Sequence, residues 1–277
     1  MFLVRSLDLM VRVCGILNRK EEQTAFQAEA ELARAELQQE YITPGGRVVS
    51  DSQTSYALAI CFDLLNENQQ VRAGERLAEL VRKNQYMIGT GFAGTPFVCE
   101  ALARTNHLQV AYSVLLNREC PSWLYPVTMG ATTVWERWDS MLPDGTINPG
   151  EMTSFNHYAL GAIAKFLFER VAGLQRVDAG WKTARIAPAI GATFSRASAH
   201  HVTPQGTVSC SWETVLVGGE EERITLNVTV PYGTRAEVIL PEGRGERTET
   251  VGAGSWVFSA IFVRDYQWPV PPLKAKS

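Results

Sequence analysis

The sequence is poor in residues that hold metals or cross-link chains. Its five cysteines are odd in number, lie far apart and form no Cys-x-x-Cys pair, and its four histidines form no cluster. A disulfide framework needs paired cysteines and a zinc site needs closely spaced ligands, so we expect neither. We expect reduced, isolated, buried thiols and no metal or other cofactor. The cysteines are Cys14, Cys61, Cys99, Cys120 and Cys210.

Long apolar runs and a strong excess of one charge are also missing. No stretch approaches the ~20 apolar residues of a membrane span. The apolar start of the chain is interrupted by Arg5, Asp8 and Arg12 and lacks the cleavage site of a signal peptide. A net charge of −3 gives no attraction to nucleic acid or to an anionic membrane. We therefore expect a soluble chain without nucleic-acid or membrane partners. The cytoplasm is favoured, although the compartment stays unknown.

A glycine-rich loop at residues 89–96 lacks the context of a nucleotide site. No apolar strand precedes it and no Gly-Lys-Ser/Thr follows it, although a phosphate-binding loop needs both. The loop instead predicts a tight turn before a helix that begins at Pro96.

The sequence does contain a series of helical patterns. With 277 residues, 45% hydrophobic and 20% charged, it has the composition of a globular protein of one large domain or two ordinary ones. Apolar residues recur every three or four positions over 3–17 and 26–41, whereas 56–65 is apolar almost without interruption. A helix that is apolar on several sides is buried. The alternation predicts two concentric helical layers, with a further long helix over 153–173.

Beyond about Gly173 the pattern changes to short β-prone runs between glycine, proline and charged turns. Such runs predict a small antiparallel β-sandwich. The expected fold class is thus α+β multidomain, with domains over 1–175 and 176–265 and a loose tail over 266–277. The expected strands are Ala184–Ile186, Ala192–His201, Thr207–Thr214, Ile224–Val230, Ala236–Leu240, Glu249–Val251 and Trp256–Val263.

The stretch 125–140 and its flank combine flat aromatic rings with charges. Indoles stack on the C–H faces of sugars, and glycoside hydrolysis needs one carboxylate as base or nucleophile and another as acid. If the stretch is helical, its two tryptophans share one face and its two acids share an adjacent face. The alternatives are a tryptophan-rich core helix and a solvated charged face with weak ion pairs. The residues are Trp123, Trp135, Glu136, Arg137, Trp138 and Asp139.

Asn156 and His157 lie downstream, where the first turn of the helix over 153–173 is expected. A lone histidine beside apolar residues more often has a structural role. The neighbouring asparagine and the preceding tryptophan–acid stretch favour hydroxyl binding instead.

Three motifs stand in order along the chain: TGFAGTPF at 90–97, YPVTMGATTVWERWDS at 125–140 and MTSFNHY at 152–158. Together they resemble signatures of the α-L-rhamnosidases of glycoside hydrolase family 78. Gln53-Thr54 and Gly180-Trp181-Lys182 also lie where that family has similar residues, and the resemblance runs from near the start to about Gly254.

The resemblance implies an inverting glycosidase that removes terminal non-reducing α-L-rhamnose from rhamnosides. It implies that Glu136 is the general base. A carboxylate between Trp135 and Arg137 would be partly desolvated yet paired, which keeps it ionised near neutral pH. Arg137 and Asp139 would support the site from behind. The implied substrate-binding residues are Trp123, Trp135, Trp138, Asn156 and His157.

The catalytic domain of that family is an (α/α)6 barrel, and only about half of its helices fit before Gly173. The resemblance therefore implies a partial six-hairpin toroid followed by the β-sandwich, with the loop 90–97 at the mouth of the barrel. The family's general acid is a glutamate in a Cys-Pro-x-Arg-Asp-Glu segment, which this sequence lacks. We expect a fragment whose possible partner is the missing N-terminal half of the barrel. The alternative is a non-catalytic remnant that binds rhamnosides or is purely structural.

Overall fold

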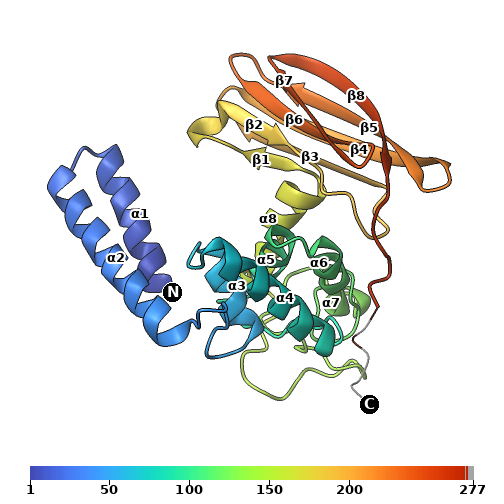
Figure 1. Ribbon diagram of the computed structural model, residues 1–277. Helices are drawn as coiled ribbons and strands as arrows, with labels where there is room; N and C mark the ends of the chain where they lie inside the picture. Colours follow the sequence, from blue (N-terminus) through green and yellow to red (C-terminus); the bar gives the residue numbers. More distant parts are fainter. Residues whose placement is uncertain (272, 274–277) are drawn as a thin grey trace. The chain divides into compact units, whose positions relative to one another are not determined.

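The protein is described here by a computed structural model that covers residues 1–271 and 273 (Figure 1). It divides into two compact units. The helical unit comprises Met1–Leu160 and is rejoined by the chain at Pro271, and the β unit comprises Gly161–Val270. The domain boundaries expected at residues 175 and 265 stay predictions.

The tail predicted over 266–277 is anchored at its last continuous described residue. The carbonyl oxygen of Pro271 accepts hydrogen bonds from Nη2 of Arg82 at 2.8 Å and from the hydroxyl of Tyr86 at 3.0 Å. Residues 272 and 274–277 of the predicted tail lie outside the described residues.

The helical unit contains seven α-helices among its described residues. Figure 1 shows the first two side by side as a hairpin and the next five grouped together. They are α1 (Phe2–Ile16), α2 (Lys20–Tyr41), α3 (Gln53–Cys61), α4 (Glu67–Lys83), α5 (Val98–Arg104), α6 (Leu108–Leu115) and α7 (Leu124–Thr128).

Helix α3 is the buried centre of this unit, as its uninterrupted apolar sequence predicts. Ser52 caps its N-terminus, since its hydroxyl accepts from the backbone amide of Ser55 while the Ser55 hydroxyl accepts from the backbone amide of Ser52. The side chains of Tyr56 and Ile60 are fully buried. The following helix, α4, is amphipathic, so the predicted alternation of buried and half-buried helices is confirmed here.

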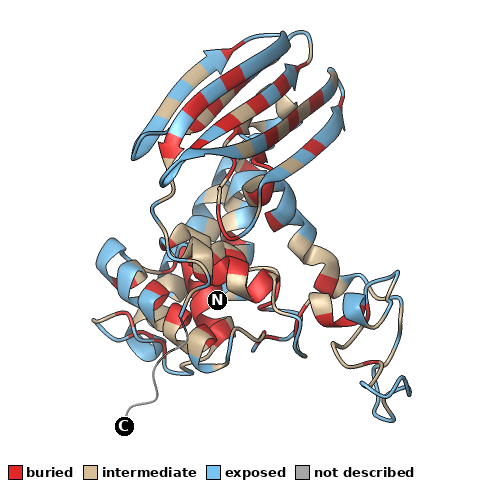
Figure 2. Ribbon diagram, turned by 90° about the vertical axis from the view of Figure 1, so that its right-hand side faces the viewer, coloured by how far each residue is buried: buried red, intermediate tan, exposed pale blue. Residues whose placement is uncertain are grey.

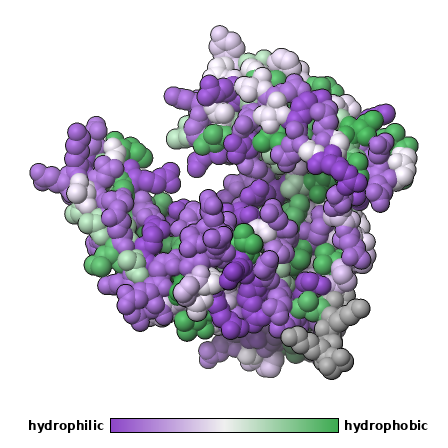
Figure 3. All heavy atoms as spheres, in the orientation of Figure 1, coloured by the Kyte–Doolittle hydropathy of each residue, from purple (hydrophilic) through white to green (hydrophobic). Residues whose placement is uncertain are grey.

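The helix predicted over residues 3–17 is present as α1, but only part of its apolar surface is covered. Val4 packs with Phe62 and its neighbours from α3 and the loop after it. Leu3, Val13 and Ile16 are exposed. Hydrophobic patches on the α1–α2 hairpin are visible in Figure 3. This helix therefore carries an apolar face that no described residue buries.

The single helix predicted over 153–173 is wrong. Irregular chain continues to Tyr158. A 3₁₀ turn (Ala159–Ile163), the short helix α8 (Ala164–Phe166) and a π-helical turn (Leu167–Val171) then follow. The backbone groups of residues 154–157 are engaged instead with residues 134–136, far away in the sequence. A helix there would have to break those hydrogen bonds.

The β unit is a sandwich of two four-stranded sheets, ordered β1-β2-β6-β7 and β3-β4-β5-β8. All of its strand pairs are antiparallel except β2 with β6, which are parallel. The seven predicted strands are present, and the short β1 is additional. The strands are β1 (Leu174–Arg176), β2 (Thr183–Ile186), β3 (Arg196–Thr203), β4 (Gly206–Gly218), β5 (Glu221–Val230), β6 (Arg235–Glu242), β7 (Gly245–Val251) and β8 (Gly254–Val263).

The core of the β unit lies between its two sheets. Buried and exposed residues alternate along the strands (Figure 2) because successive side chains of a strand point to opposite faces. Ile186 and Val238 from one sheet and Ile224 and Leu226 from the other belong to the same buried cluster. The indole of Trp212 also belongs to it and donates a hydrogen bond to the carbonyl oxygen of Val171 at 2.9 Å.

Candidate active site

The stretch 125–140 is not a continuous helix. Helix α7 ends at Thr128, and Gly130 follows with a φ of 83°, a left-handed conformation that favours glycine. Residues 131–139 form irregular loop structure. The condition under which Trp135 and Trp138 would share a helix face is therefore not met. Tertiary contacts bring the tryptophans together instead.

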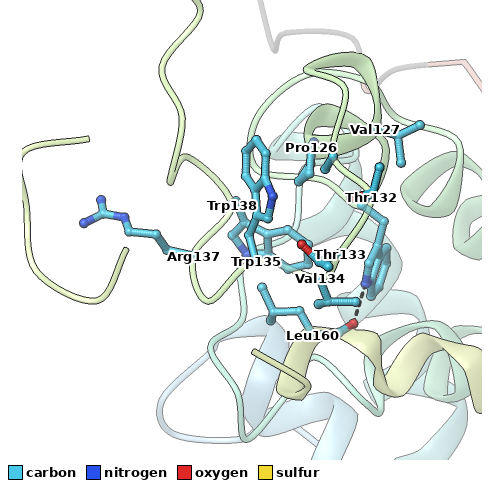
Figure 4. Close-up of a pocket in the computed structure, with 11 residues that line it drawn as sticks. Pro126, Val127, Thr132, Thr133, Val134, Trp135, Arg137, Trp138 and Leu160 are labelled. Carbon is cyan, nitrogen blue, oxygen red and sulfur yellow. Dashed lines mark hydrogen bonds between the residues drawn. The ribbon is translucent and has the colours of Figure 1, made fainter. Parts of the chain in front are cut away.

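Three tryptophans line one pocket of about 270 Å³ (Figure 4). The rings of Trp123 and Trp138 meet edge to face, with centroids 5.6 Å apart, and Nε1 of Trp123 donates to the carbonyl oxygen of Leu160 at 2.8 Å. Trp135 is buried and packs edge to face on Phe155. The remaining lining is largely aliphatic or small, so the pocket offers aromatic and apolar surface with few charges.

Glu136 is half-buried, beside the tryptophans in sequence, but it is not among the residues that line this pocket. Its amide donates to the carbonyl oxygen of Ser154 at 2.8 Å, and its Oε2 accepts from the amide of Ser154 at 3.2 Å. These two contacts hold both the backbone and the carboxylate of Glu136 against the second loop, 152–158.

The expected pairing of Glu136 with Arg137 does not occur. Nε and Nη2 of Arg137 donate to the two carboxylate oxygens of Asp139 at 2.6 and 3.1 Å, and Nη1 donates to the carbonyl oxygen of Glu151. Asn148 also donates to Asp139. Figure 4 shows the guanidinium directed away from the tryptophans. Part of Arg137 lines the pocket, while its guanidinium and Asp139 tie together the loops beside it.

The Arg137 guanidinium holds the pKa of Asp139 below its usual value, although burial of the carboxylate acts in the opposite direction. The same pair raises the pKa of Arg137. Asp139 thus stays ionised, and its charge is directed at the guanidinium.

His157 lies in the second loop, where its amide donates to the carbonyl oxygen of Val134 at 2.8 Å. Its ring stacks on Phe92, with centroids 5.0 Å apart and planes 14° apart. Asn156 is exposed, and its amide donates to the Ser154 hydroxyl oxygen at 3.2 Å. The structure thus places both residues next to Glu136 along the paired loops, while neither lines the tryptophan pocket.

Two residues near the site were missed by the sequence analysis. Ser154 holds the Glu136 carboxylate through its backbone amide, and Phe92 covers a face of the His157 ring. A backbone contact leaves no signal in residue type. Phe92 lies within the TGFAGTPF motif, so that motif was the available signal.

No metal centre or membrane helix emerges from the described part of the chain. Within residues 1–271 and 273, no group of three or more His, Cys, Asp or Glu side chains is arranged to hold a metal ion. In the same residues, every helix is too short or too polar to cross a membrane.

Family comparisons match nearly the whole chain. Residues 1–171 match the bacterial alpha-L-rhamnosidase 6 hairpin glycosidase domain. The chain belongs to the α-L-rhamnosidase family. Residues 173–255 match the C-terminal domain of the bacterial alpha-L-rhamnosidases. The resemblance of the three motifs is thereby confirmed.

Curated α-L-rhamnosidases are substantially longer than this chain. An α-L-rhamnosidase of Formosa agariphila is 37% identical over 246 residues, which are 88% of this chain and 26% of that protein. One from Streptomyces avermitilis is 36% identical over 78% of this chain and 20% of that protein. The chain thus spans about a quarter or less of these relatives.

Solved α-L-rhamnosidase structures share the fold. The enzyme from Aspergillus terreus superimposes with a TM-score of 0.87 at 38% identity over 95% of this chain and 30% of that chain. The Streptomyces avermitilis enzyme, solved with L-rhamnose, gives 0.86 at 32% identity over 93% of this chain and 26% of that chain. The predicted fold class, part of a six-hairpin toroid followed by a β-sandwich, is confirmed.

Proposed function

We propose that this chain contributes the general-base side of an inverting α-L-rhamnosidase site that cleaves terminal non-reducing α-L-rhamnose from rhamnosides. The observation that carries the proposal is the convergence of Trp123, Trp135 and Trp138 on one pocket, next to a carboxylate fixed by a backbone amide. The relative from Streptomyces avermitilis, solved with L-rhamnose, supports the choice of sugar.

Glu136 is the proposed general base. In an inverting glycosidase, the base removes a proton from a water molecule that attacks the anomeric carbon opposite the leaving group. Oε2 of Glu136 is held by the Ser154 amide, and among the described residues no other donor binds its Oε1. Oε1 is therefore the oxygen available to that water, while the tryptophans would stack on the apolar faces of the sugar.

The general acid is proposed to come from protein outside this chain, in the missing N-terminal half of the barrel. The acid would lie about 6.5–9.5 Å from the Glu136 carboxylate, the separation that leaves room for a water molecule. The relatives are far longer than this chain, and the exposed apolar residues Leu3, Val13 and Ile16 offer a surface for further helices. The substrate itself would be a rhamnoside.

The test is hydrolysis of p-nitrophenyl α-L-rhamnoside by the 277-residue chain, with and without the upstream half of a relative's barrel. Hydrolysis that requires the added half and is lost in Glu136→Gln supports the proposal. Glu246→Gln is the matched control, because Glu246 is also a glutamate but is exposed and lies on β7 of the other unit. Unchanged hydrolysis in Glu136→Gln would overturn the role of Glu136.

The alternative, a non-catalytic remnant that binds rhamnosides or is structural, predicts a different result. It gives no hydrolysis under either condition, even though the chain is folded. Rhamnose binding then separates a binding remnant from a structural one, and calorimetry with methyl α-L-rhamnoside measures it directly.

A further inference from the structure

A neighbouring aromatic ring stacks on the imidazole of His157 and restricts the tilt of the imidazole plane. Phe92 stacks nearly parallel on it, with 5.0 Å between ring centroids and 14° between planes. Tyr158 is also nearly parallel to it, at 5.6 Å and 4°. Tyr158 is 88% exposed, whereas Phe92 is 38% exposed. Phe92 is the less exposed of the two rings, so it is the neighbour that can restrict the orientation of the imidazole.

The hydrogen bonds of His157 also set its tautomer. The backbone amide of Ala159 approaches Nδ1 at 3.3 Å. A backbone N–H can only donate, so Nδ1 must be the acceptor and the neutral ring carries its proton on Nε2. Because Phe92 covers a face of the ring and Ala159 occupies the Nδ1 edge, the Nε2–H edge is the polar group left for a ligand.

Phe92 lies in a loop that is fixed by hydrogen bonds within the loop and to helix α3. The Gly89 amide donates to Oε1 of Gln53 at 2.8 Å, and the hydroxyl of Thr95 binds the carbonyl oxygen of Gly91 at 2.9 Å. The Thr90 and Thr95 hydroxyls are 2.9 Å apart. Gln53 is on the buried helix α3, so the loop is tied to the core of the unit.

We propose that Phe92 is a positioning residue that fixes the His157 ring so that Nε2–H donates to an oxygen of the bound sugar. The identity of the ligand, a sugar, rests on the proposed function. The orientation of the His157 ring rests only on its contacts with Phe92 and Ala159. The ligand chemistry is a hydroxyl or ether oxygen, which accepts a hydrogen bond from a neutral Nε2–H. Phe92 acts through His157 and need not touch the sugar.

The test compares Phe92→Leu, which keeps apolar bulk without a ring, with Phe92→Tyr, which keeps the ring. NMR of the sugar-free chain reports the ring-current shifts of the His157 carbon-bound protons and the tautomer from its nitrogen shifts. In Phe92→Leu we expect the ring-current shift to be lost. Phe92→Tyr should retain it, and the wild-type chain should show the Nε2–H tautomer.

The second measurement is the dissociation constant for methyl α-L-rhamnoside. An aromatic pair contributes about 0.5–1.5 kcal/mol, so Phe92→Leu should weaken binding by about 2- to 12-fold, with rescue in Phe92→Tyr. Phe97→Leu is the matched control, since Phe97 packs on Phe62 instead. A loss of the same size in Phe97→Leu would indicate a general packing effect and overturn the proposal.

The two measurements separate this inference from the function on which it rests. Unaltered His157 shifts in Phe92→Leu would overturn the inference whatever the sugar does, and so would unaltered binding. If the wild-type chain binds no rhamnoside with or without the upstream half, the proposed function fails. The NMR comparison then still decides whether Phe92 stacks on the imidazole and which tautomer the ring adopts.

Discussion

Arg137 and Asp139 form a two-contact ion pair of 2.6 and 3.1 Å, which directs the guanidinium away from the neighbouring Glu136. Glu136 is instead held by the neutral amide of Ser154. A carboxylate bound to a cation is a weaker base. Of the two acids in the tryptophan-rich stretch, only Asp139 is paired with a cation, and this difference agrees with the proposal that Glu136 is the proton acceptor.

The first prediction concerns this ion pair. Both side chains are more than a third exposed, so solvent screening should leave only a weak contribution of the pair to the free energy of unfolding. A double-mutant cycle with Arg137→Met and Asp139→Asn, each of which removes one charge, followed by urea denaturation, measures that coupling. The coupling should shrink as salt is added. Coupling near zero at low salt would mean that the pair does not hold these loops.

The second prediction concerns acid stability at Asp51. Its carboxylate accepts from Nε and Nη2 of Arg76 at 3.0 and 2.6 Å and from the Tyr56 hydroxyl at 2.9 Å. The Arg76 guanidinium holds the pKa of Asp51 far below its usual value. In the unfolded chain the Asp51 carboxylate takes up a proton near pH 4, whereas in the folded chain it stays ionised at that pH. The contact therefore makes its full contribution to the free energy of unfolding above about pH 4. It is lost as the pH falls through the folded-state pKa.

Asp51→Asn tests that contribution cleanly, since asparagine also tolerates the φ of 44° at this position. The variant should be about 1–2 kcal/mol less stable than the wild type at pH 7. Urea unfolding at a series of pH values should show the two stabilities converging below pH 4. A difference that stays constant down to pH 2 would contradict the assignment.

The third prediction concerns the glycines of the loop that carries Phe92. A Cβ on Gly94 would lie 2.6 Å from Oγ1 of Thr54, whereas a Cβ on Gly91 would meet nothing within 4 Å. Gly94→Ala should therefore lose about 1–3 kcal/mol of stability through overpacking. Gly91→Ala should be nearly neutral by thermal unfolding. Adding Thr54→Ala should restore much of the loss in Gly94→Ala, and failure to do so would place the strain elsewhere.

The fourth prediction compares two tryptophans of the same pocket. Trp123→Phe removes the hydrogen bond from Nε1 to the Leu160 carbonyl oxygen, which should cost about 1 kcal/mol. Trp138→Phe keeps a ring at a position where no hydrogen bond of the indole is recorded among the described residues, so its loss should be smaller. Urea denaturation of both variants measures the difference. Equal losses would mean that ring volume, not the hydrogen bond, matters at Trp123.

The layout of the helices and strands could largely be predicted from the sequence. The apolar run at 56–65 indicated the buried helix α3, and the short β-prone runs after Gly173 indicated the seven longer strands of the sandwich. These patterns are local, because the periods of helices and strands are written in consecutive residues. The parallel pairing of β2 with β6 was missed, since it joins strands far apart in the sequence.

The motifs, read as a resemblance, identified the α-L-rhamnosidase family and singled out the tryptophan–acid stretch, but tertiary structure decided how that stretch is shaped. Hydrogen bonds between Glu136 and Ser154 and between Val134 and His157 form paired loops where a helix was predicted to begin at 153. The partner of Arg137 and the tautomer of His157 follow from those loops. Such contacts join backbone groups about twenty positions apart, where neither residue type nor periodicity specifies the partner. The sequence alone thus determined the family and the elements, and the folded chain determined the geometry of the site.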